Sequence, residues 1–76
     1  MPEKKIFHFY NRDFDVLVIV RAIGEIAAAD KANDYLQWQQ IHEVSFKPNE
    51  ATEIPFESDS DVLYAEMNGN SLNLGN

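Results

Sequence analysis

The first third of the chain alternates between apolar and polar positions with the period of a β-strand. Residues 5–10 place Phe7 and Phe9 on one face, and residues 14–21 continue the alternation. The second stretch carries these residues on one face: Phe14, Val16, Val18 and Val20. Its middle is apolar on both faces, as expected for a central strand. The short turn at residues 11–13 then predicts an antiparallel hairpin.

Residues 25–40 have the pattern of one amphipathic helix. This stretch consists largely of strong helix formers, and small alanines recur on one face at a spacing of three to four residues. Such a face allows close packing against a sheet. Trp38, near the expected end, is either the last core contact of the helix or an exposed edge residue.

The remainder predicts further short strands. Residues 41–47 alternate again, with Val44 and Phe46 on one face together with His42. Residues 52–56 read as an edge strand, because Pro55 cannot donate to a sheet. Residues 62–67 read as a strand with three inward side chains, which are Leu63, Ala65 and Met67. The Asn68-Gly69 pair is a strong hairpin signal, so residues 71–74 are expected to return along that strand.

These elements predict a single α+β domain over residues 1–76. We expect a mostly antiparallel sheet of four or five strands with one helix packed on one face, in the order β-β-α-β-β. The predicted core is Phe7, Phe9, Val16, Val18, Val20, Ala29, Ala32, Leu36, Val44, Phe46 and Leu63. One helix covers only one face. We therefore expect the second apolar face to be covered by the segment after Pro48, by a second copy of the chain or by a partner.

The cysteine and histidine content and the length of the apolar runs exclude several classes of protein. The chain of 76 residues contains no cysteine and two histidines, so neither a disulfide nor a thiolate metal site can form. The longest apolar run is too short to span a membrane. We therefore expect a cytoplasmic protein without a metal or cofactor, and the missing cysteine agrees with a reducing compartment.

Charge is distributed unevenly along the chain. The net charge is −7, and all six basic residues lie within residues 1–47. The charged residues of the segment 48–76 are all acidic. We predict that these six acids bind a partner: Glu50, Glu53, Glu57, Asp59, Asp61 and Glu66. Direct binding to nucleic acid or to an anionic membrane is disfavoured, because both need Lys and Arg. A protein with a basic surface is the expected partner.

No pattern reaches the specificity of a catalytic or metal motif. A calcium loop starting at Glu57 fails, because its sixth and twelfth positions hold Val62 and Asn68. His8 and His42 could meet across neighbouring strands, but their spacing does not require a metal. The aromatic residues near the start lack the basic surroundings of a base-stacking sheet. The prediction is therefore that the protein is not an enzyme.

The leading hypothesis is a small acidic inhibitor or adaptor that binds another protein. One concrete form is a phage or mobile-element protein that blocks a host nucleic-acid-handling (defence) complex through its acidic C-terminal half. The alternative is a structural homo-oligomer, in which a free sheet edge and the second sheet face are buried between copies.

Overall fold

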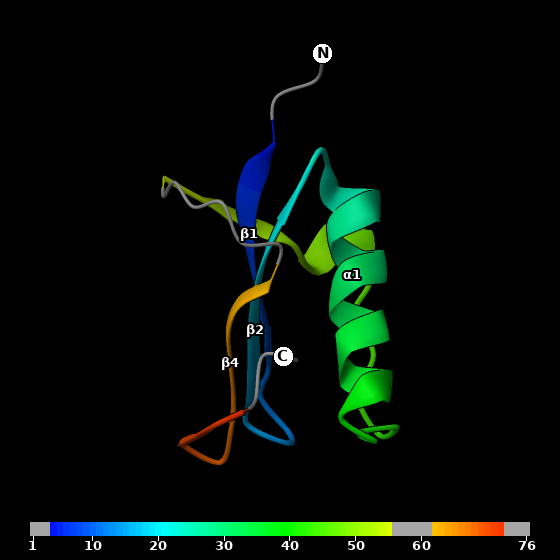
Figure 1. The fold of residues 1–76 in the computed structure, drawn as a ribbon, viewed down its shortest axis with the longest axis vertical. Coiled ribbons are helices and arrows are strands. Elements are labelled where there is room, and N and C mark those ends of the chain that lie inside the picture. Colours follow the sequence, from blue (N-terminus) through cyan, green and yellow to red (C-terminus); the bar gives the residue numbers. More distant parts are fainter. Residues whose placement is uncertain (1–3, 56–61, 73–76) are drawn as a thin grey trace.

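The computed structural model describes residues 4–55 and 62–72, with one helix packed against one face of a five-stranded antiparallel sheet (Figure 1). The elements are β1 (Lys5–Asn11), β2 (Val16–Ala22), α1 (Glu25–Trp38), a short 3-10 turn η1 (Pro48–Glu50), β3 (Thr52–Ile54), β4 (Val62–Met67) and β5 (Asn70–Ser71). The strand order is β3-β1-β2-β4-β5. The predicted α+β class is confirmed.

The core lies between α1 and the sheet. Phe9 pairs with Val18 in the β1–β2 register, and Val18 pairs with Ala65 on β4, so all three project to the same side. The inward face of α1 is built from Ala28, Ala29, Ala32, Tyr35 and Leu36, all buried. Every predicted core residue is buried except Leu63, whose side chain lies outside the described part.

The predicted strand at residues 41–47 is wrong, because this stretch is an irregular connection. The helix ends in a Schellman motif: Ile41 N–H donates to the Leu36 carbonyl at 2.8 Å and Gln40 N–H donates to the Gln37 carbonyl at 2.9 Å. Gln40 has a φ of 62°, which turns the chain sharply. Ile41 and Leu36 are both buried, and an apolar pair at these two positions is common in this motif. Apolar alternation here therefore marks contacts with the core rather than a strand.

The second strand begins two residues later than expected. Alternation predicts that Phe14 shares the core face with Val16, but Phe14 lies in the turn between β1 and β2 and is 41% exposed. The Asn11 side chain accepts a hydrogen bond from the Phe14 N–H at 2.9 Å, and Asp15 has a φ of 52°. A local side-chain hydrogen bond thus favours a turn where periodicity favoured a strand.

The C-terminal predictions are largely confirmed. β3 is a short edge strand followed by Pro55, and β4 and β5 form an antiparallel hairpin. Its turn residues Asn68 and Gly69 have φ values of 54° and 81°, the positive values that a type I′ turn requires. β5 spans Asn70–Ser71, so it begins one residue before the predicted stretch, and residues 73–74 of that stretch lie outside the described part. An irregularity opposite Ile19 and Val20 shifts the β2–β4 register.

Candidate functional site on the open face of the sheet

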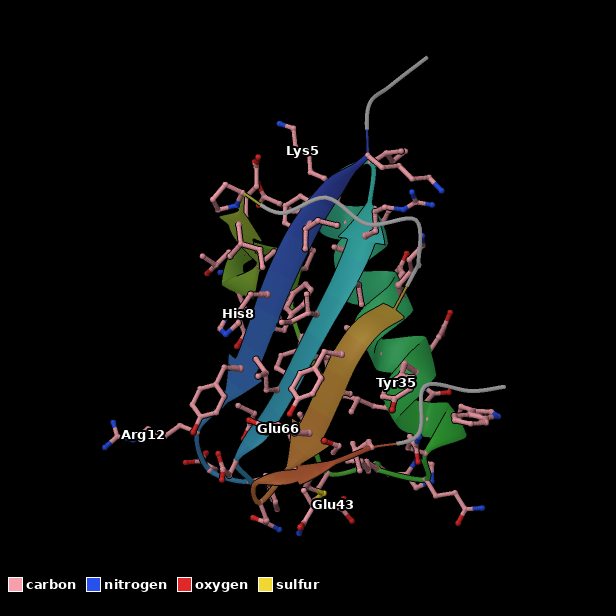
Figure 2. All side chains as sticks on the ribbon, turned by 60° about the vertical axis from the view of Figure 1, so that its left-hand side comes forward. Lys5, His8, Arg12, Tyr35, Glu43 and Glu66 are labelled. Atoms are coloured by element: carbon pink, nitrogen blue, oxygen red, sulfur yellow. The ribbon has the colours of Figure 1, made fainter. Side chains whose placement is uncertain are left out.

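One face of the sheet is not packed against any described helix or strand. We call it the open face; it carries Ile6, His8, Tyr10, Leu17, Ile19, Arg21, Thr52, Ile54, Tyr64 and Glu66. These residues alternate with the core residues along the same strands. Figure 2 views the molecule from this side, with α1 behind the sheet.

Exposure is concentrated in one half of the open face. At one end Ile6 is only 2% exposed, and its neighbours Arg21 and Ile54 are half-buried. At the other end, near the β1–β2 turn, Tyr10 is 46% and Tyr64 is 37% exposed. The accessible half is therefore an aromatic surface around the half-buried Leu17 and Ile19.

Each exposed tyrosine of this half donates a hydrogen bond to a carboxylate. The Tyr10 hydroxyl donates to Asp15 Oδ1 at 2.9 Å, and the Tyr64 hydroxyl donates to Glu66 Oε2 at 2.8 Å. Leu17 pairs with Tyr10 on one side and with Glu66 on the other, so it lies between them. We call Tyr10, Asp15, Tyr64 and Glu66 the tyrosine–carboxylate cluster.

The cluster combines neutral phenols with negative charge. The hydrogen bond to Asp15 raises the pKa of Tyr10 above its ordinary value, and the negative charge of Glu66 adds a smaller effect in the same direction. Each carboxylate accepts one tyrosine hydrogen bond and keeps further lone pairs available. Acceptors and aromatic rings thus lie side by side on an exposed surface, which is suited to a cation.

Arg12 is the described cation whose charge acts on Tyr10 of this cluster. Arg12 lies in the β1–β2 turn, and Figure 2 shows it extending away from the sheet. Among the described residues it forms no ion pair with Asp15 or Glu66. The charge of Arg12 nevertheless acts on the pKa of Tyr10 in the lowering direction, so Arg12 offsets part of the negative charge at this end of the open face.

The described members of the predicted acidic set lie apart. Glu50 caps η1, where its Oε1 accepts a hydrogen bond from the Lys47 N–H at 2.9 Å. Glu53 lies on β3 beside Lys5, with Nζ and Oε1 separated by 3.6 Å. Its register partner Phe7 belongs to the core face, so Glu53 and Glu66 project to opposite sides. Two strands separate β3 from β4, a distance of about 14 Å.

Half of that set lies outside the described residues, namely Glu57, Asp59 and Asp61. The claim that all six acids form one binding surface therefore stays a prediction. Sequence reasoning missed Tyr10, Asp15 and Tyr64 as site residues. Alternation over residues 5–10 puts Tyr10 on the face opposite Phe7 and Phe9, but only the pairing of β2 with β4 brings Tyr64 and Glu66 into the same surface.

The two histidines are not on neighbouring strands. His8 is half-buried on β1, between Ile19 of β2 and Thr52 of β3, whereas His42 is exposed in the connection after α1. Within residues 4–55 and 62–72 no three acidic or histidine side chains are placed to hold a metal ion. Over the same residues, α1 is neither long nor apolar enough to cross a membrane.

Two exposed apolar side chains lie at opposite ends of α1. Ile26 is 71% exposed near the start of the helix, and Trp38 is 57% exposed at its end. The Trp38 ring lies 6.1 Å from the Tyr35 ring, between centroids. These side chains lie on the opposite side of the molecule from the open face, so they provide matched control positions.

Comparison with known proteins returned no match: no family model, curated protein or solved structure is similar to this chain. We therefore infer function from the described side chains and their contacts.

Proposed function

We propose that this protein is a non-enzymatic binding module that docks onto a basic segment of a partner protein through the accessible half of its open face. One observation carries the proposal. Two exposed tyrosines, each hydrogen-bonded to a carboxylate, lie on a sheet face that no described element covers.

Tyrosine suits such a contact for physical reasons. Its ring buries a large area at a small cost in side-chain entropy, and its hydroxyl keeps a polar partner. Aromatic residues are accordingly enriched in protein interfaces. The half-buried Leu17 and Ile19 lie on β2, between Tyr10 on β1 and Tyr64 on β4. The apolar contact area therefore extends across three strands.

Charge favours a basic partner over a second copy. A net charge of −7 makes two copies repel each other, while it attracts a basic surface and increases the association rate. A stable dimer also needs roughly 20–30 residues from each side, far more than the accessible half supplies. A short basic segment fits both the size and the charge of this surface.

Inhibition of a nucleic-acid-handling complex belongs to the same proposal. Enzymes that bind nucleic acid present Lys and Arg along their channels. A folded domain with tyrosines and carboxylates on an open sheet face would bind to a basic segment of such a channel and block it. The phage or mobile-element origin rests on the small size and acidity of the chain, and the partner's identity rests on this electrostatic match.

The test compares two double variants in a capture experiment from a lysate of the source cell. Tyr10→Ala/Tyr64→Ala removes the aromatic surface of the open face, and Ile26→Ala/Trp38→Ala removes two more exposed apolar side chains from the ends of α1. All four residues are exposed, so both variants should fold. Affinity for the captured protein should fall about tenfold or more only in the open-face variant.

Two outcomes would overturn the proposal. The first is loss of binding in the α1 variant with the open-face variant unaffected. The second is a dimer in sedimentation that persists at high salt and is lost only in the open-face variant, which would identify the occupant as a second copy of the chain.

A further inference from the structure

We propose that the tyrosine–carboxylate cluster is a binding site for one arginine side chain of the partner. The guanidinium lies over Leu17 between the two tyrosine rings and donates hydrogen bonds to Asp15 and Glu66. This inference rests on the proposed function and specifies the chemistry that the open face recognises.

The sheet register determines the shape of the site. Tyr10, Leu17 and Glu66 form one row across β1, β2 and β4, and Tyr64 precedes Glu66 by two residues on the same face. Adjacent strands are about 4.8 Å apart, so Tyr10 and Glu66 are separated by about 10 Å at the backbone. Leu17 occupies the position between them and provides an apolar floor for a flat group.

The hydrogen bonds already present orient the acceptors. Because the Tyr64 hydroxyl holds one Glu66 oxygen at 2.8 Å and the Tyr10 hydroxyl holds one Asp15 oxygen at 2.9 Å, each carboxylate has a defined direction. The remaining lone pairs can accept from a charged donor. Charge-assisted hydrogen bonds of this kind are stronger than neutral ones.

Arginine fits these features better than lysine. Its guanidinium is planar, carries five donors in a rigid arrangement and stacks on aromatic faces. The guanidinium is also less strongly hydrated than an ammonium group, so it loses less hydration free energy when it leaves water. A site of two rings and two separated carboxylates uses both properties, whereas an ammonium group would use only the charge.

The test is a titration of the isotopically labelled protein with hexa-arginine and, separately, with hexa-lysine at low ionic strength, followed by amide and tyrosine-ring NMR shifts. Hexa-arginine should shift the resonances of the cluster and of Leu17. It should bind about two- to fivefold more tightly than hexa-lysine, the advantage expected from a contact with an exposed ring.

Two charge-matched variants complete the test. Glu66→Gln removes one negative charge from the cluster and keeps an amide oxygen, and Asp34→Asn removes the same charge from the exposed side of α1. Affinity for hexa-arginine should fall about two- to fivefold in Glu66→Gln, the effect of losing a partly exposed ion pair, and should be nearly unchanged in Asp34→Asn.

Failure of the inference and failure of the proposed function are distinguishable. Equal affinity for the two peptides, with shifts confined to the cluster, would overturn the arginine site and leave a basic partner on the open face. Shifts spread evenly over the acids of α1 would overturn the arginine site as well, and the double alanine variants then decide the proposed function independently.

Discussion

The Asn33 side chain forms two hydrogen bonds with the backbone of Phe46: its Oδ1 accepts from the N–H at 2.7 Å, and its Nδ2 donates to the carbonyl at 2.9 Å. This pair replaces the hydrogen bonds that a neighbouring strand would have provided. It also positions the Phe46 ring 5.1 Å from the Phe9 ring, between centroids. One side chain of α1 therefore fixes the path of the connection that follows it.

Replacing Asn33 with alanine should destabilise the protein. The Phe46 N–H and carbonyl would lose their partners in a half-buried position, which costs about 1–3 kcal/mol. Urea unfolding monitored by circular dichroism measures the loss. The exposed neighbour Asp34→Ala is the control and should change the free energy of unfolding little. Equal urea midpoints for Asn33→Ala and wild type would show that the pair contributes nothing.

Replacing Gln40 with glycine should stabilise the protein by about 1 kcal/mol, because Gln40 occupies the left-handed region with a φ of 62°. Glycine adopts this conformation without a steric cost. The preceding residue supplies the control: Gln39 has a φ of −80° and a side chain bonded to Tyr35, so Gln39→Gly should be destabilising. Thermal unfolding midpoints that move in the same direction for both variants would contradict this assignment.

The two faces of β2 should respond differently to charge. Val18 is fully buried against α1, so Val18→Asp places an unpaired charge in the core and should prevent folding. Its neighbour Ile19 is half-buried on the open face, where water reaches an aspartate, so Ile19→Asp should retain a cooperative thermal transition. A transition for Val18→Asp near the wild-type midpoint would show that the core face is misassigned.

The pKa of Tyr10 should fall toward 10 in Asp15→Asn, because the hydrogen bond to Asp15 is the main cause of its upward shift. Because the pKa of Tyr10 is higher in the folded protein than in the unfolded chain, Tyr10 stabilises the fold at pH values below its unfolded pKa, which is near 10. That contribution is lost as the pH rises through the folded pKa of Tyr10. NMR titration of the Tyr10 ring measures the shift. Glu25→Gln, at the start of α1, is the control and should leave the Tyr10 titration unchanged.

Replacing Glu53, Glu57, Asp59 and Asp61 together with Asn or Gln should slow association with the partner. Each exposed charge contributes little alone, about 0–1 kcal/mol, but their shared field steers the encounter. Stopped-flow association at low and high salt checks this, and salt should slow wild type more than the variant. Unchanged association at low salt would leave the tyrosine–carboxylate cluster as the relevant acidic surface and the other acids as aids to solubility.

The elements that could be predicted from the amino-acid order are those whose signals are local. Alternation over residues 5–10 and 16–21 defined the first hairpin and its core face, because side chains of a strand point alternately to opposite sides. The spacing of alanines defined α1, and Asn68-Gly69 defined the last hairpin through its need for positive φ. Each of these features depends on neighbouring residues alone.

Which segments lie side by side could be seen only in the folded structure. Alternation assigns a residue to a face but does not say which strand pairs with which, because pairing depends on contacts distant in the sequence. The pairing of β2 with β4 places Tyr64 and Glu66 beside Leu17, and the pairing of β3 with β1 moves Glu53 to the other side of the sheet. The same limit explains residues 41–47, whose apolar alternation is satisfied by core contacts and by Asn33 instead of a neighbouring strand.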